Sequence, residues 1–95
     1  MDYEIAYEAD AQDDLDEILN HLSQYYPDTP KKFDMTFHKV LDRLRYDPHY
    51  AYYKWWPVFR KVNVGDYIVL YTVDEESRLV TIHHVRHGMR SPYQP

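Results

Sequence analysis

The sequence predicts an α+β fold of two layers, in which an N-terminal strand and a helical hairpin precede a three-stranded antiparallel meander. Three observations lead to this prediction. Apolar residues alternate with polar ones at the start of the chain, recur at helical spacing in two longer segments, and alternate again in three short segments near the end. Short connections join these last three segments, which favours antiparallel neighbours. A helical hairpin packed on such a sheet buries one of its faces.

The first strand is expected in YEIAYE (residues 3–8), where aromatic and aliphatic residues alternate with glutamate and alanine. The period then changes, and residues 10–26 are expected to form a helix whose apolar stripe is Ala11, Leu15, Ile18, Leu19 and Leu22. Acidic residues crowd its first turns, where the helix dipole favours negative charge. Pro27 is expected to end this helix.

A second helix is expected in residues 28–48. Thr29 suits the N-cap, Pro30 suits the first helical position, and Pro48 stops the helix. Its apolar stripe is Phe33, Phe37, Val40, Leu41 and Leu44.

Three strands are expected in VFRKVNV (58–64), YIVLYTV (67–73) and LVTIHHV (79–85), separated by the turns Gly65-Asp66 and DEESR. Strand parity places Val62 and Val64 toward the helices and Lys61 on the other face; Arg60 shares the helix side unless a bulge rotates it. The middle strand is apolar on both sides, so both of its faces should be covered. The aromatic residues just before these three strands either pack over the edge of the sheet or form an interface with a partner protein. They are Tyr52, Tyr53, Trp55 and Trp56.

Composition indicates a single domain over residues 1–95, of which 44% are hydrophobic and 17% aromatic. No apolar run is long enough to span a membrane. The acidic, alternating N-terminus is not a signal peptide, so a cytoplasmic location is expected. The net charge of −5 argues against a general polyanion binder. Residues 1–53 carry five Lys/Arg against twelve Asp/Glu and residues 54–95 carry six against four, which is an ordinary uneven surface or a local basic face.

Several kinds of site are excluded. The chain has no cysteine, so disulfides and thiolate metal sites are impossible. Its two glycines, Gly65 and Gly88, are too far apart for a phosphate-binding loop, and its three serines lie in no nucleophile elbow. His83 and His87 would chelate a metal on a helix, but four residues of strand span ~13 Å. We therefore expect neither a cofactor nor a metal.

A cluster of cationic and proton-transferring residues remains on the last three strands and beyond them. Histidine, lysine and tyrosine can transfer protons and arginine can hold phosphate oxygens, so such a set could cleave RNA at the ribose 2′-hydroxyl without a metal. Each residue alone could equally form a cross-strand salt bridge to Glu4, Glu8 or Asp66. The cluster consists of Arg60, Lys61, His84, Arg86, His87, Arg90 and Tyr93.

The order of elements resembles the RelE/ParE superfamily of bacterial type II toxins. YEIAYEADAQDDLDEILNHL is similar to the opening strand and first helix of that superfamily. FRKVNVGDYIVLYTVDEESRLVTIHHVRHGMR is similar to its later signature, which has a basic pair, a turn, a Y-x-V-x-Y-x-V-D strand and a His-Gly-x-Arg-like tail.

The resemblance implies a toxin that a cognate antitoxin neutralises, and that reaches operator DNA only through this antitoxin. RelE-like members cleave messenger RNA in the ribosomal A site on the concave sheet face, whereas ParE-like members inhibit DNA gyrase and are not nucleases. The first mechanism leads here, with the ribosome and mRNA as partners and the chain as a metal-independent endoribonuclease. The alternatives are gyrase inhibition and a non-toxic interaction module that kept the fold. A small RNA-binding domain ranks below these, because the RNP-type motif is missing.

Residue by residue, the resemblance implies catalytic roles for Lys61, His87, Arg90 and Tyr93. It leaves RNA or target binding to Arg60, His84 and Arg86. One position departs from the pattern. RelE has an arginine directly after the third-strand tyrosine, but here Tyr67 is followed by Ile68. That loss of a phosphate-binding cation weakens the nuclease hypothesis, and so does the acidic net charge.

Overall fold

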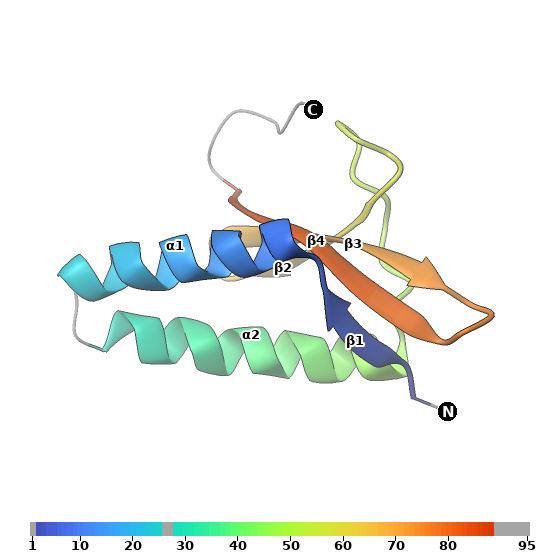
Figure 1. Ribbon diagram of the computed structural model, residues 1–95, viewed down its shortest axis with the longest axis horizontal. Coiled ribbons are helices and arrows are strands. Elements are labelled where there is room, and N and C mark those ends of the chain that lie inside the picture. Colours follow the sequence, from blue (N-terminus) through green and yellow to red (C-terminus); the bar gives the residue numbers. More distant parts are fainter. Residues whose placement is uncertain (1, 26–27, 89–95) are drawn as a thin grey trace.

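Two helices and a four-stranded sheet make up the part of the chain that the computed structural model describes, residues 2–25 and 28–88 (Figure 1). No helix in these two ranges combines the length and the apolar character that crossing a membrane requires. In chain order the elements are β1 (Glu4–Tyr7), α1 (Ala9–Tyr25), α2 (Thr29–Tyr46), β2 (Arg60–Val64), β3 (Tyr67–Asp74) and β4 (Leu79–His87).

The sheet has the strand order β1-β4-β3-β2. The strands β2, β3 and β4 form the expected antiparallel meander, and β1 pairs in parallel with β4 from Glu4–Leu79 to Tyr7–Ile82. Gly65 has a φ of +58° in the turn between β2 and β3, a left-handed conformation that glycine adopts without steric cost. The predicted α+β architecture is therefore confirmed.

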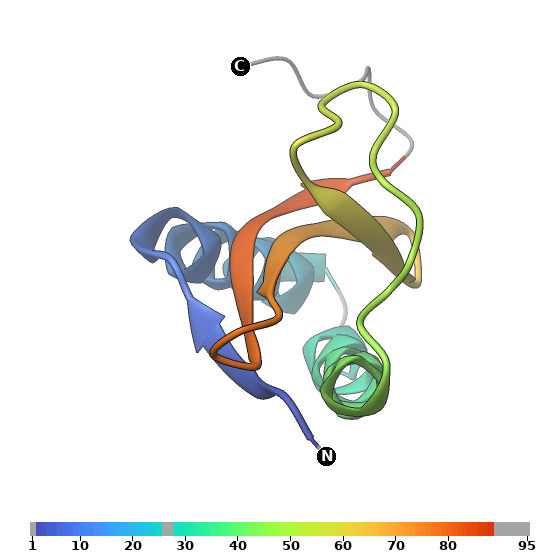
Figure 2. The ribbon, with the colours of Figure 1, turned by 90° about the vertical axis from the view of Figure 1, so that its right-hand side faces the viewer.

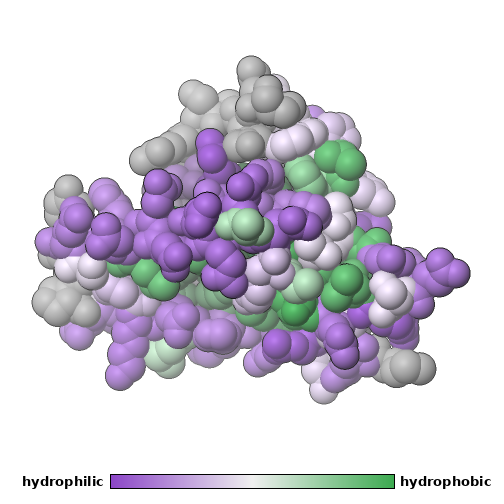
Figure 3. Space-filling model, in the orientation of Figure 1, coloured by the Kyte–Doolittle hydropathy of each residue, from purple (hydrophilic) through white to green (hydrophobic). Residues whose placement is uncertain are grey.

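The main core lies between the helices and one face of the sheet, which we call the inner face. The apolar stripe of α2 and Ala11 and Leu15 of α1 pack there against Val62 and Val64 of β2, as strand parity predicted. The sheet residues Val64, Val69, Tyr71, Val80 and Ile82 are fully shielded from solvent. Figure 3 shows the opposite, hydrophilic sides of the helices covered with polar side chains (purple).

The ends of the helices agree with the sequence except at one cap. The helix α2 begins at Thr29 with Pro30 in its first turn, but its N-cap is Asp28, not Thr29, and the Asp28 side chain makes no capping hydrogen bond. The N-cap prediction was therefore wrong by one residue. Helix α2 ends at Tyr46, two residues before Pro48, and the Asp47 N–H donates to the Arg43 carbonyl. The predicted stop of α1 at Pro27 lies outside the described residues.

Candidate functional site

The second face of the sheet, which we call the outer face, carries most of the residues that the sequence singled out. The strand register places Lys61, Leu70 and His84 in one row across β2, β3 and β4. The next row holds Asn63, Ile68 and Arg86. The structure thus brings Lys61, His84 and Arg86 of the predicted cluster onto one face.

A bulge in β4 changes which histidines reach this face. Leu70 pairs with His84 and Tyr71 pairs with Ile82, so His83 is the extra residue. A bulge of this kind re-aims side chains along one strand. Both His83 and His84 consequently contact the ring of Phe59, with ring centroids 4.9 and 5.6 Å apart.

His87 lies on the inner face, opposite Lys61. Its register partner is Tyr67, and the two rings meet edge to face at 5.2 Å. Tyr67 in turn contacts Phe33 of α2 at 5.2 Å. The sheet therefore separates His87 from Lys61, although the resemblance implies that both residues belong to one catalytic site. Arg90 and Tyr93 lie outside the described residues.

The outer face is covered by the segment of residues 51–60, which we call the flap. Backbone hydrogen bonds close the flap into a narrow hairpin: the Tyr53 N–H donates to the Phe59 carbonyl, and the Lys61 N–H donates to the Ala51 carbonyl. Figure 2 shows this segment (yellow-green) on the side of the sheet opposite α2. The sequence left open whether the aromatic residues at positions 52, 53, 55 and 56 pack over the sheet or form a partner surface. The structure shows packing for two of them, Tyr53 and Trp56.

The inner side of the flap forms a second apolar cluster with the sheet. Tyr53, Phe59, Ile68 and Leu70 are buried in this cluster, and Trp56 packs against it. Trp56 also stacks on His84 at 5.5 Å. Ile68, the residue that stands where the resemblance implies an arginine, is only 9% exposed here. The face that a phosphate would have to approach is therefore largely filled by apolar and aromatic side chains.

Hydrogen bonds and ring contacts hold the cationic side chains of this region. Arg60 donates from Nη1 to the Tyr50 carbonyl at 2.6 Å and from Nη2 to the Tyr52 hydroxyl at 3.1 Å, and its guanidinium lies 4.3 Å from the Tyr52 ring centre. Arg60 thus fixes the flap to the sheet. The Lys61 side chain is half-buried beside Leu70.

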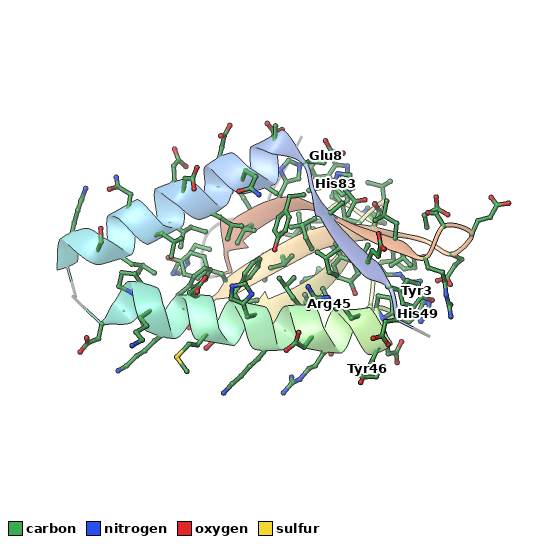
Figure 4. All side chains as sticks on the ribbon, turned by 60° about the horizontal axis from the view of Figure 1, so that its bottom comes forward. Tyr3, Glu8, Arg45, Tyr46, His49 and His83 are labelled. Atoms are coloured by element: carbon green, nitrogen blue, oxygen red, sulfur yellow. The ribbon has the colours of Figure 1, made fainter. Side chains whose placement is uncertain are left out.

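The two outer histidines lie in unlike surroundings. His83 Nε2 is 2.8 Å from the Thr72 hydroxyl, and burial lowers the pKa of His83, an effect that nearby Glu8 partly opposes. Figure 4 shows Glu8 and His83 near each other at the start of α1. His84 Nδ1 lies 3.9 Å from the Asp14 carboxylate of α1, and its side chain is 14% exposed. Its aromatic neighbours make His84 a packed group more than an accessible acid or base.

A groove of about 440 Å³ runs between α1 and the C-terminal end of β4. Arg86 and His87 line one wall, whereas Asp14 and Glu17 line the other. Asp14 also accepts a hydrogen bond from the Val85 N–H at 3.0 Å, at the part of β4 that β1 does not reach. Carboxylates that face Arg86 disfavour a polyanion in this groove. The described residues include no group of side chains suited to hold a metal ion.

A polar cluster that the sequence did not reveal joins three distant segments. His49 Nδ1 lies 2.9 Å from Asp47 and His49 Nε2 lies 2.5 Å from Glu75, in the turn after β3. Glu75 also accepts a hydrogen bond from the Tyr3 hydroxyl at 2.8 Å, and Arg78 donates to the same hydroxyl at 3.2 Å. Figure 4 shows Tyr3 and His49 close together at the end of α2. No motif marks these residues, because up to 75 positions separate partners such as Tyr3 and Arg78.

This cluster shifts the pKa of its members in the directions that opposite charges dictate. Hydrogen bonds to Glu75 and then Asp47 raise the pKa of His49. Hydrogen bonds from His49 lower the pKa of both carboxyl groups, with the backbone N–H as the larger cause at Asp47 and the ring as the larger cause at Glu75. The cluster therefore holds residues 47–49, which lead from α2 to the flap, against the β3–β4 turn while His49 is protonated.

Comparison with protein families found one match that spans most of the chain. Residues 5–92 match the family model described as the ParE toxin of the type II toxin–antitoxin system parDE. No curated protein sequence matched this chain.

Solved structures share the fold at low sequence identity. A chain of the chromosomal ParDE toxin–antitoxin system from P. aeruginosa is similar, with a TM-score of 0.72 and 14% identity over 90% of this chain and 95% of that one. A chain of the RelBE2 toxin–antitoxin complex from Mycobacterium tuberculosis has a TM-score of 0.65 and 19% identity, covering 92% of this chain and 99% of that one. A chain of the archaeal RelE–RelB complex from Pyrococcus horikoshii has a TM-score of 0.62 and 18% identity, covering 96% and 100%.

Proposed function

The chain belongs to the ParE toxin family of type II toxin–antitoxin systems, and we propose that it arrests growth by binding and inhibiting DNA gyrase. In this proposal the toxin acts as a protein ligand and carries out no hydrolytic chemistry. A cognate antitoxin binds the toxin and neutralises it, and the toxin contacts operator DNA only through this antitoxin. The similar chains from P. aeruginosa, M. tuberculosis and P. horikoshii belong to such toxin–antitoxin systems or complexes, which supports the proposal of an antitoxin partner.

The observation that carries the proposal is the filled outer face. A ribosome-dependent nuclease needs cations around a phosphate and an accessible acid and base near the ribose. Here Ile68 and Leu70 lie under Tyr53 and Phe59 on that face. Lys61 and His87 lie on opposite faces of the sheet. A face filled in this way leaves a phosphate no cationic site, whereas the exposed Tyr52 and Trp55 of the flap suit contact with a protein.

Charge supports the same choice. The net charge is −5, and the acidic residues of α1 line the groove that also holds Arg86 and His87. Binding to ribosomal RNA rewards clustered positive charge. Gyrase inhibition through a protein–protein contact has no such requirement.

A second candidate function remains, ribosome-dependent cleavage of mRNA. One observation favours it: Lys61 and His84 occupy a single row on the outer face, with Arg86 in the next row. A shift of the flap would expose these residues. Lys61 and His84 could then act as acid and base, and Arg86 could bind a phosphate. In that case Lys61→Ala should reduce cleavage by ~10²-fold or more, as should His84→Ala and Arg86→Ala.

The experiment that tests the proposal is controlled expression in bacteria, with labelled thymidine and labelled amino acid followed in parallel cultures. Gyrase inhibition predicts that thymidine incorporation falls first and that a DNA-damage response follows. It also predicts that Lys61→Ala still arrests growth. Early loss of amino-acid incorporation, abolished by Lys61→Ala, would contradict the proposal and establish the nuclease. Absence of any growth phenotype while folded protein accumulates would indicate a non-toxic interaction module.

A further inference from the structure

The flap has two apolar sides, and only one of them packs against the sheet. Residues that recur at every third position along the flap divide between the two sides: Tyr53, Trp56 and Phe59 pack inward. The other side exposes Tyr52 at 57%, Trp55 at 49% and Val58 at 61%. These three are most of the large hydrophobic residues exposed on the described chain, the others being Met35 and Tyr46 on α2.

The exposed side is held in a defined shape. The Tyr53–Phe59 backbone hydrogen bond and two tight turns, from Trp56 N–H to Tyr53 O and from Phe59 N–H to Trp56 O, fix the hairpin. Arg60 lies against the Tyr52 ring, and Lys54 Nζ lies 4.7 Å from the ring centre of Trp55. A surface of preorganised tyrosine, tryptophan and arginine has the composition of binding hot spots. Its side chains lose little further freedom on binding.

The charge of this segment is the opposite of that of the rest of the chain. Residues 48–65 contain no aspartate or glutamate, although the whole chain has 16 acidic residues. The same stretch contains Lys54, Arg60 and Lys61. A partner that covers the exposed side would therefore meet apolar rings bordered by positive charge, and the complementary surface is acidic with an apolar centre.

We propose that the exposed side of the flap, formed by Tyr52, Trp55 and Val58 and bordered by Lys54, is the surface by which the toxin docks on an acidic protein surface of its cellular target. The inference rests on the proposed function, since the target is then gyrase. The flap accordingly has two roles: its inner side closes the sheet face, and its outer side makes the recognition surface. The proposal leaves the antitoxin to another surface of the toxin.

Single substitutions on the flap test this proposal, each matched by a control on the exposed side of α2. Trp55→Ala is compared with Tyr46→Ala, Val58→Glu with Met35→Glu, and Lys54→Glu with Lys39→Glu. All six positions are exposed. Each variant should therefore keep a thermal unfolding midpoint within a few degrees of the wild type. The readouts are inhibition of supercoiling by purified gyrase, and capture by the cognate antitoxin.

The flap variants should lose inhibitory potency by about 10-fold or more, whereas the α2 controls should stay within about 2-fold. The loss for Lys54→Glu should shrink as salt is raised, because its contribution is a screened charge interaction. Capture by the antitoxin should be unchanged in all six. Flap variants that inhibit as well as the wild type would overturn the proposal.

Two other outcomes would assign the surface to a different occupant and also overturn it. Parallel loss of antitoxin capture and of gyrase inhibition would place the antitoxin on the flap. A wild-type dimer that Trp55→Ala converts to a monomer, measured by light scattering, would place a second copy there. A wild-type toxin that leaves gyrase unaffected would instead contradict the proposed function itself, and with it this inference.

Discussion

The substitution Tyr71→Phe removes one buried hydroxyl. It should destabilise the fold at the point where the chain leaves α2 and runs toward the flap. Tyr71 is fully shielded from solvent on the inner face of β3. Its hydroxyl donates to the Pro48 carbonyl at 2.6 Å and accepts from the Tyr50 N–H at 3.4 Å. These bonds join the central strand to the residues just after α2. They fix the path by which the chain crosses to the outer face.

The magnitude follows from these two contacts. A buried acceptor that loses its donor costs about 1–3 kcal/mol, whereas the long 3.4 Å contact adds little. Phenylalanine fills nearly the same volume, so no cavity term is added. We expect a free energy of unfolding lower by about 2 kcal/mol, measured by urea denaturation with an unchanged m-value.

The matched control is Tyr67→Phe, because the Tyr67 hydroxyl makes no hydrogen bond to another described residue and its ring is likewise packed on the inner face. The control should cost less than about 0.5 kcal/mol. Equal, small effects of both substitutions would refute the argument that the Tyr71 hydroxyl anchors the connection.

Alkaline pH gives an independent check. Burial raises the pKa of Tyr71 to about 12, above the ordinary value of 10.0. A group whose folded pKa is raised stabilises the fold at low pH and loses that contribution as the pH rises through the folded value. The advantage of the wild type over Tyr71→Phe should therefore shrink between pH 10 and about 12. An advantage that stays constant over this range would contradict the assignment.

Three further predictions concern other parts of the fold. Glu75 and Asp47 raise the pKa of His49 above its ordinary value of 6.5. The stability that His49 adds to the fold is therefore complete below pH 6.5 and is lost as the pH rises through the pKa of His49 in the folded protein. The melting temperature of the wild type should fall over this range, and that of His49→Gln should not. Phe37→Ala should cost about 3–5 kcal/mol in chemical denaturation, because Phe37 is buried between the helices and the sheet. Asp14→Ala leaves the Val85 N–H without its acceptor and should lower stability by about 1–2 kcal/mol, whereas exposed Asp13→Ala should have almost no effect.

Local patterns were sufficient to predict the fold, because each helix and strand has a characteristic spacing of apolar residues within its own short segment. The helical spacing of Phe33, Phe37 and Leu44 fixes which side of α2 is buried. The short turn at Gly65 fixes the pairing of β2 with β3. The N-cap error at Thr29 arose because Asp28 and Thr29 are both good capping residues, and the sequence offers no local means to choose between them.

The candidate site was harder to predict, because it depends on a bulge and on the path of a loop. Simple alternation along β4 does not reveal that His83 is an extra residue, and this residue decides on which face His84 and His87 lie. The inward and outward residues of the flap recur at every third position, which matches neither the strand period nor the helical period, so its hairpin had no sequence signal beyond its aromatic content. The contacts of His49 with Glu75 link residues 26 positions apart, which no local pattern encodes.

The isoleucine at position 68 and the flap that covers it belong to one structural arrangement, which differs from that of a sheet with an arginine at this position. In the covered outer face, an arginine at position 68 would lie beneath Tyr53 and Phe59 and beside the groove that Asp14 and Glu17 also line. A cation beneath the flap is costly unless it is paired, and pairing with these carboxylates would hold it away from a phosphate, so the covered face does not suit a phosphate-binding arginine. An open face with a phosphate-binding arginine and a closed face with an apolar residue are therefore two self-consistent arrangements of one sheet. This chain has the second arrangement, and that is the physical reason to seek its activity on the outer side of the flap and not beneath it.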